Sequence, residues 1–407
     1  MNVEYFISKR IVSAKENKNV FSRPIIRVTI SAIALSVAVM LISLSVLEGF
    51  QSEVTNKVVS FGSHIQIAPY QSVDDKTKSP LELTDKFIKS VSTNKEVSEI
   101  HPIVYDFALV KTNTDFLGIN LKGVAKTYNW ENIEDKITQG VGVNSDSSIL
   151  ISEQIAGKLN LQLGDKIRVY FPSVKNERVN VRPFYVCGLY NSSMSEFDES
   201  MTFVSINKLQ KVKSWSEKEV SLIEIHLFDF SDVERVTKYL SVSVEDYYNK
   251  NVKSIHQLYP QIFDWLKLQD VNVMVIILLM LLVAGVNIIS SLLILILEKT
   301  SFIGILKSMG VSNWSVRKIF LYNAMYLVSK GLLWGNFIAF MLLFVQYQFE
   351  IISLDESTYY MSTIPISFNL TSIFLLNIGT LITCLLMMIL PTIVITKISV
   401  VKAIRFH

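Results

Sequence analysis

The sequence is poor in the residue patterns that catalysis and metal binding require. Its two cysteines, Cys187 and Cys384, lie far apart, so neither a disulfide framework nor a cysteine-based metal site is indicated. The five histidines are scattered without ligand spacing, and we interpret them as ordinary surface or core residues. Glu196, Asp198 and Glu199 gather beside serines on a predicted turn, which indicates a solvated loop. We therefore predict no catalytic residue and no metal site.

A nucleotide-binding motif is also missing. No G-x-x-x-x-G-K-[ST] sequence occurs, so the chain is not expected to bind ATP in that mode. The 39 basic and 36 acidic residues nearly balance, which gives no argument for a nucleic-acid partner. Hydrophobic residues make up 50% of the chain, which is too much for a typical soluble domain, yet 18% of the residues are charged. Charged and apolar residues must therefore be segregated along the chain.

Four apolar runs are long enough to cross a bilayer, which requires about 20 residues each. They indicate an α-helical membrane protein with four transmembrane helices and one large extracytoplasmic α+β domain. The transmembrane helices are expected at residues 28–48, 271–297, 319–347 and 372–396.

The orientation follows from the charges of the short segments between these runs. Residues 1–27 contain six Lys or Arg residues and residues 298–318 contain four, whereas residues 348–371 contain three acidic residues and no basic one. The segments 1–27, 298–318 and the tail 397–407 are therefore predicted to be cytoplasmic. The loop 348–371 and the large domain 49–270 are predicted to lie outside, with both termini inside.

The large domain of about 220 residues can bury its own core, in two subdomains. We predict an α/β subdomain from residues 49–110 and 219–270, with a β-rich insert at about 111–218. Helices are expected with Thr84 and Ser231 as N-caps. One loop of the insert carries basic residues between two prolines, and it is either a solvated hairpin or a site for an acidic partner. Its residues are Phe171, Pro172, Lys175, Arg178, Arg182 and Pro183.

The segment between the second and third runs has a helical pattern. Phe302, Ile305, Leu306 and Met309 fall at i, i+3, i+4 and i+7, and Gly310 follows where a helix commonly ends. The next helix is expected to begin at Ser312 or Asn313. This short amphipathic helix either rests in the lipid interface or docks on a soluble motor.

Several short stretches resemble the FtsX-like permeases of type VII ABC transporters, and among them the lipoprotein-releasing LolC/LolE subfamily. The resemblance is carried by five motifs in order, which span nearly the whole chain. They are G-F-Q-S-E at 49–53 with S-H-I-Q-I at 63–67, L-Q-L-G-D-K at 161–166, residues 188–198, E-K-T-S-F-I-G-I-L-K-S-M-G at 298–310, and Pro391 with 400–405.

The resemblance implies a permease of the bacterial inner membrane with a periplasmic, porter-like domain. It implies a cytoplasmic ABC ATPase dimer that holds the ATP and Mg²⁺, a second permease copy or a paralogue, and lipoprotein cargo extracted from membrane lipids. Residues 3–14 would form an elbow helix, and the loop at 171–183 would occupy the place of a hook that captures a periplasmic carrier. The implied ATPase-coupling residues are Glu298, Lys299, Thr300, Phe302, Ile303, Gly304, Ile305, Leu306, Met309 and Gly310.

The family picture also implies a lipid-accessible chamber between the first two spans of two permease copies. The alternative for each candidate is a side chain that faces lipid or packs between helices. The candidate chamber residues are Met40, Leu44, Leu47, Phe50, Val273, Met274, Ile277 and Met280.

Lys330 is a basic residue inside the third apolar run. It lies about 18 Å along the helix from Lys318, which is deep for a lysine that reaches the membrane surface. We therefore expect it to face the helix bundle or a wet cavity.

Three other functions remain open at this point. The chain could be a MacB-like efflux permease, an FtsX-like regulator of cell-wall hydrolases without transport, or a membrane receptor.

Overall fold

The computed structural model describes residues 3–13, 22–70, 79–111, 116–172, 180–245 and 250–397. The chain divides into two compact units, which we call the membrane unit and the exterior unit. The membrane unit contains residues 1–52, 266–353 and 363–407, and the exterior unit contains residues 53–265 and 354–362. In the described residues, four helices are long and apolar enough to cross a membrane: Ile26–Phe61, Pro260–Glu298, Asn313–Phe349 and Leu370–Thr396. With an exterior unit of helices and sheets, they confirm the predicted fold class.

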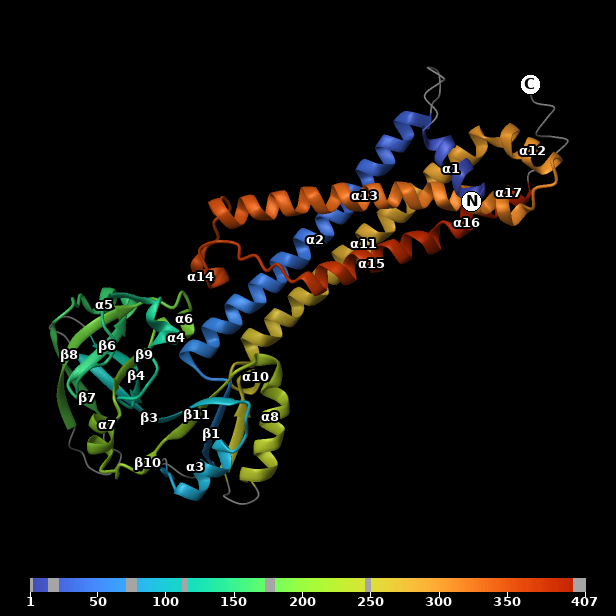
Figure 1. Ribbon diagram of the computed structural model, residues 1–407. Helices are drawn as coiled ribbons and strands as arrows, with labels where there is room; N and C mark the ends of the chain where they lie inside the picture. The colour runs from blue at the N-terminus through green and yellow to red at the C-terminus, as the bar shows by residue number, and fades with distance from the viewer. Residues whose placement is uncertain are drawn as a thin grey trace. The chain divides into compact units, whose positions relative to one another are not determined.

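The membrane unit is a helix bundle around one apolar core. Helix α1 packs along α13 (Figure 1). The rings of Tyr5 and Tyr322 meet there edge to face, with centroids 5.9 Å apart. The N-cap of α13 is Ser312, whose hydroxyl accepts a hydrogen bond from the backbone N–H of Ser315 at 3.2 Å. The helices are α1 (Val3–Ser13), α2 (Ser22–Phe61), α11 (Pro260–Glu298), α12 (Thr300–Ser308), α13 (Asn313–Phe349), α15 (Leu370–Met387), α16 (Ile389–Thr392) and α17 (Val394–Lys397).

Two glycines allow α13 to approach α2 closely. A Cβ atom at Gly331 would lie 2.5 Å from Cγ2 of Ile33, and one at Gly335 would lie 2.7 Å from the carbonyl oxygen of Ala34. Small residues spaced by four are typical of helix contacts in membranes, where close packing replaces the hydrophobic driving force of water. Side chains at these two positions would push the helices apart.

The exterior unit contains a sheet in the order β12-β1-β11-β3, with all pairs antiparallel. Helices α3 and α8 bury one face each beside this sheet. The predicted cap Thr84 is confirmed, because its side chain accepts a hydrogen bond from Phe87 N. The predicted cap Ser231 is wrong: a 3₁₀ turn precedes α8, and Asp229 accepts from Ser231 N at 2.8 Å.

Strand β3 leaves this sheet and continues into a small closed barrel (Figure 1). It pairs with β11 up to Ile103 and with β4 from Val104 onward, so the change of partner precedes residue 111, where the insert was expected to begin. The barrel pairings run β3–β4–β9–β6–β8–β7 and return to β3. Closure removes the exposed strand edges that invite aggregation.

The bounds of the exterior elements complete the description. The strands are β1 (Ile65–Pro69), β2 (Leu81–Glu82), β3 (Val97–Lys111), β4 (Phe116–Val124), β5 (Ile137–Gly140), β6 (Ser148–Ser152), β7 (Lys166–Phe171), β8 (Asn180–Tyr190), β9 (Met201–Ser205), β10 (Glu219–Val220), β11 (Leu222–Leu227) and β12 (Lys250–Ser254). The helices are α3 (Asp85–Ser92), α4 (Glu131–Glu134), α5 (Glu153–Leu159), α6 (Ser195–Asp198), α7 (Ile206–Lys213), η1 (Phe230–Asp232), α8 (Val233–Leu240), η2 (Ser241–Glu245), α10 (Ile255–Leu258) and α14 (Glu356–Tyr359).

Candidate coupling site

Helix α12 lies where the sequence predicts it, and it ends as predicted at Gly310. The glycine has a φ of +81°, a left-handed conformation that costs a residue without a side chain little. Its N–H donates to the carbonyl of Lys307 at 3.1 Å, and Val311 N–H donates to the carbonyl of Leu306 at 3.1 Å. This pair of bonds is the Schellman motif, which closes a helix and lets the next begin at Ser312.

The predicted apolar stripe of α12 is divided between two faces. Leu306 is buried in the core of the membrane unit together with Ile303 and Gly304, and Phe302 packs partly against it. Ile305 is 50% exposed and Met309 is 75% exposed. An inner face therefore anchors α12, while Ile305 and Met309 form an exposed pair at i and i+4 that is available to a partner.

Polar contacts hold both ends of α12. The Lys307 ammonium donates to the carbonyl oxygen of Ile395 in α17 at 2.7 Å, and burial lowers the pKa of this lysine. Thr300 donates to the carbonyl of Leu297 at 2.6 Å, while Glu298 and Lys299 form an ion pair at 3.3 Å. Helix α12 therefore sits at the end of the bundle where α1, α16 and α17 gather (Figure 1).

The predicted chamber residues do not share one environment within a single chain. Met40 is fully buried in the core between the helices. Met274 is 70% exposed, and Ile277 and Met280 pack partly against the core. Leu44, Leu47, Phe50 and Val273 are half-buried, so the set as a lining remains a prediction about an assembly.

Lys330 lies on the exposed side of α13 and does not enter the core of this chain. Its ammonium lies 5.8 Å from the centroid of the Tyr326 ring. A hollow of about 410 Å³ beside it is lined by Lys330 itself with Leu333, Trp334 and Phe337. The lysine therefore faces the surroundings of the chain with aromatic side chains next to it.

The predicted carrier loop belongs in part to the barrel. Phe171 is the last residue of β7 and is buried in the barrel core, where it pairs with Asn180 of β8. Pro172, Arg182 and Pro183 are exposed. The two remaining basic residues of the loop, Lys175 and Arg178, lie outside the described residues.

A buried ion pair in the exterior unit escaped the sequence reasoning. Lys122 of β4 and Glu224 of β11 are both fully buried, with Nζ and Oε2 2.8 Å apart. The same ammonium donates to the carbonyl oxygen of Phe61 at 2.8 Å, and Tyr105 donates its hydroxyl to Glu224 Oε1 at 3.1 Å. Because Phe61 is the last residue of α2, Lys122 places a cation at the negative end of that helix.

Burial raises the pKa of the Glu224 carboxyl, and the neighbouring Lys122 opposes that shift. The end of α2, strand β4 of the barrel and strand β11 of the open sheet therefore meet at the ion pair of Lys122 and Glu224, which we call the charged node. The available sequence signal was a single acidic residue, Glu224, in a strand whose other residues are aliphatic except His226.

Aromatic rings surround the end of α2. The Phe61 ring lies 5.4 Å from that of Phe197 in α6 and 5.2 Å from that of Tyr190 in β8. Asp198 orients this segment, because its carboxylate accepts hydrogen bonds from the N–H of Ser192 at 3.1 Å and from its hydroxyl at 2.8 Å. Asp198 is only 8% exposed, so the prediction that it belongs to a solvated loop is wrong.

The segment 354–362 between α13 and α15 attaches to the exterior unit, to which it belongs. The Lys57 ammonium in α2 donates to the carbonyl oxygen of Tyr360 at 2.7 Å. The Tyr360 hydroxyl donates to Glu196 Oε1 at 3.0 Å, and its ring meets Trp265 edge to face. This segment therefore contacts α2 at Lys57, one turn before Phe61, which the aromatic rings surround.

Three of the scattered histidines meet in the exterior core. The ring of His226 lies 5.7 Å from that of His64 and 5.5 Å from that of His101. Burial lowers the pKa of His226 to about 3 and that of His64 to about 4, so both are neutral at pH 7. Among the described residues, no group of three or more His, Cys, Asp or Glu side chains has a geometry that could hold a metal ion.

Comparisons with known proteins agree with this architecture. The model of the MacB-like periplasmic core domain matches residues 28–242, and that of the FtsX-like permease C-terminal region matches residues 274–400. The lipoprotein-releasing system transmembrane protein LolC of Neisseria meningitidis is 26% identical and covers 82% of this chain and 80% of its own length. LolE of Haemophilus influenzae is 25% identical and covers 82% and 81%.

Among solved structures, the periplasmic region of MacB from Actinobacillus actinomycetemcomitans covers 49% of this chain and 93% of its own, at 15% identity and a TM-score of 0.34. The family resemblance stated from the motifs is confirmed by the two family models, one of which spans more than half of the chain. The chain belongs to the permeases that join a MacB-like periplasmic core domain to an FtsX-like C-terminal region.

Proposed function

We propose that this chain is the permease subunit of an ABC transporter that releases lipoproteins from the inner membrane for delivery to the outer membrane. The similarity to LolC and LolE over most of the chain supports this cargo. Both termini lie in the cytoplasm, the exterior unit lies in the periplasm, and the assembly includes a second permease, identical or paralogous. A separate ATPase dimer holds the ATP and Mg²⁺, and this chain supplies no catalytic group.

The need for a motor follows from the energetics of the cargo. Burial of each CH₂ group in lipid is worth about 0.8 kcal/mol, so one long acyl chain resists extraction by roughly 10 kcal/mol. A lipoprotein with several chains does not leave the bilayer at a useful rate without coupling to ATP.

The observation that carries the proposal is the division of α12 into an anchored and an exposed face. Ile305 and Met309 dock on the ATPase, while Leu306 and Lys307 tie the helix to the bundle. Helices α2 and α11 each run without a break from the membrane unit into the exterior unit. Motion of α12 is then passed along continuous helices to the charged node at the end of α2.

The test combines the variant Ile305→Asp/Met309→Asp with an assay of mature lipoproteins retained in the inner membrane. We expect the ATPase to be lost on copurification and lipoproteins to accumulate there, because two charges on the exposed face oppose apolar docking. Asn313→Asp, an exposed position just beyond α12, is the matched control. Normal lipoprotein sorting with the ATPase still bound would refute the docking role.

Depletion of the whole chain separates the remaining alternatives. Lipoprotein accumulation in the inner membrane supports release. Normal sorting with a defect in cell division supports a regulator of cell-wall hydrolases, and normal sorting with drug sensitivity supports an efflux permease.

A further inference from the structure

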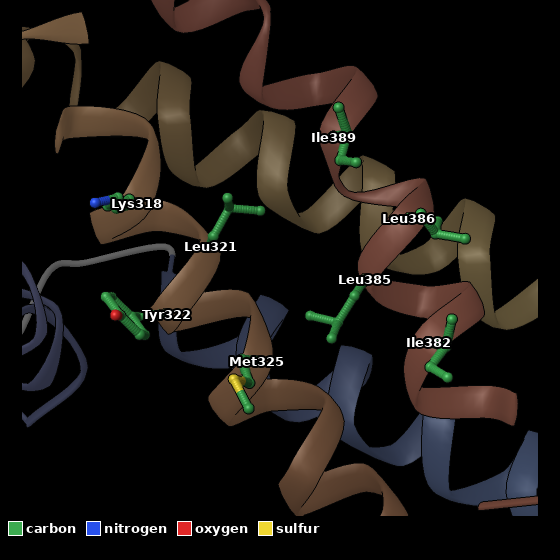
Figure 2. Close-up of a pocket in the computed structure, with 8 residues that line it drawn as sticks. All are labelled: Lys318, Leu321, Tyr322, Met325, Ile382, Leu385, Leu386 and Ile389. Atoms are coloured by element: carbon green, nitrogen blue, oxygen red, sulfur yellow. The ribbon is translucent and has the colours of Figure 1, made fainter. Parts of the chain in front are cut away.

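A groove of about 410 Å³ lies between α13 and α15 in the membrane unit (Figure 2). Leu321 and Leu385 project toward one another from the two helices in this view. The lining is aliphatic and methionine side chains apart from two residues with polar atoms, Lys318 at one end and Tyr322 midway along the α13 wall. The lining residues are Lys318, Leu321, Tyr322, Met325, Ile382, Leu385, Leu386 and Ile389.

The polar end of the groove carries positive charge. Lys318 is half-buried, with its ammonium 5.9 Å from the ring centroid of Trp314. The adjacent Arg317 has its Nε atom buried, with no hydrogen-bond partner among the residues that the structure describes. Both residues lie in the first turns of α13, next to the basic segment that the charge distribution assigns to the cytoplasmic side.

The shape of the groove suits a hydrocarbon chain along the helices. From Lys318 to Met325 helix α13 rises about 10 Å, and the facing wall runs from Ile382 in α15 to Ile389, the first residue of α16. No carboxylate is among the lining residues. A groove that is apolar along its length and cationic at its cytoplasmic end complements an acyl chain attached to an anionic headgroup.

We propose that this groove binds one anionic phospholipid of the cytoplasmic leaflet, with its phosphate at Lys318 and an acyl chain between Leu321 and Leu385. The site lies on α13 and α15, whereas the predicted cargo chamber lies on α2 and α11. The phospholipid is therefore a resident ligand and not cargo, and its binding does not depend on the proposed function. The bound phospholipid connects α13, the helix that follows α12, to α15.

Phospholipid binding is measured on the purified full chain by native mass spectrometry. Phosphatidylglycerol is compared with phosphatidylcholine of the same acyl chains. We expect one tight site that prefers phosphatidylglycerol, and a loss of about fivefold in that preference for Lys318→Gln, the worth of one basic residue near an anionic surface. Leu385→Trp, which fills the groove, should weaken both lipids.

Two control variants separate this site from general attraction to lipid. Lys330→Gln removes a cation from the same helix outside the groove, and Leu390→Trp enlarges an exposed side chain that does not line it. Both should bind phosphatidylglycerol as the wild type does. Equal affinity of Lys318→Gln and wild type, or an equal loss in Lys330→Gln, would overturn the proposal.

A second measurement on the wild-type chain guards against a groove variant that fails to fold. A phosphatidylglycerol analogue with a photoreactive diazirine in its acyl chain should label peptides that contain 321–325 and 382–389. Labelling confined to other helices would overturn the proposal whatever the variants show.

Discussion

The two units connect their elements with different polar pairs. In the exterior unit, the fully buried charges of Lys122 and Glu224 join β4 to β11. In the membrane unit, the neutral amides of Asn336 in α13 and Asn377 in α15 donate to each other, at 2.7 and 3.0 Å. The amide pair is reciprocal, whereas in the ion pair the ammonium only donates and the carboxylate only accepts. An isolated charge is far costlier in a medium without water than an isolated amide. Loss of one partner should therefore destabilise the exterior unit more than the membrane unit.

The largest effect is expected when the ion pair is broken. Glu224→Ala leaves Lys122 buried and without its carboxylate, which should cost about 3–5 kcal/mol in the free energy of unfolding of the exterior unit. Denaturant unfolding followed by tryptophan fluorescence measures it. The double variant Lys122→Met/Glu224→Leu should regain most of the stability.

Arg235→Ala is the matched control, since Arg235 forms an exposed ion pair with Asp232 in the same unit. It should cost less than about 1 kcal/mol. If Glu224→Ala behaves like this control, the buried pair does not hold the strands together.

Acid should act on the exterior unit next. The folded-state pKa of His64 is lowered from 6.5 to about 4, so the unfolded chain binds this proton first as the pH falls. The contribution of neutral His64 to the free energy of unfolding is complete above the unfolded pKa and is lost between about pH 6.5 and 4. The loss is about 3 kcal/mol for this group.

The pH dependence of unfolding of the full chain measures that loss. His226→Leu should flatten the curve, since the pKa of His226 is lowered to about 3 by burial in the same cluster. A stability of the exterior unit that is constant from pH 7 to 4 would contradict the assignment.

The smallest effect is expected in the membrane unit. Asn336→Leu leaves the amide of Asn377 without its interhelical partner, and hydrogen bonds between membrane helices are worth about 1 kcal/mol. Unfolding of the detergent-solubilised chain measures the difference, with Leu333→Ala on the exposed side of α13 as the control. A loss as large as that of Glu224→Ala would remove the contrast between the units.

The sequence predicts local features well and distant partners poorly. Gly310 and Thr84 were identified because a helix end is decided by its neighbouring residues. The inward face of α12 depends on contacts with α17 far along the chain, so Leu306 and Ile305 could not be told apart by spacing alone. Lys122 and Glu224 likewise come from strands far apart in the chain, and the sequence of neither strand identifies the other residue of the pair.

The Asp198 error has the same origin. A turn rich in serine and acidic residues is usually solvated, and Glu196 and Glu199 are exposed here, but Asp198 is buried and its carboxylate accepts hydrogen bonds from Ser192. The segment forms the short helix α6, and tertiary packing buries Asp198, which a composition typical of a turn does not predict.

The segment 354–362 has a consequence for exchanging parts between relatives. Because residues 354–362 belong to the exterior unit, the chain passes between the units four times, at residues 52–53, 265–266, 353–354 and 362–363. A transplanted exterior domain cut at 53 and 265 would leave behind the Tyr360 contacts of Lys57 and Glu196. A working chimera has to take both pieces from the same donor.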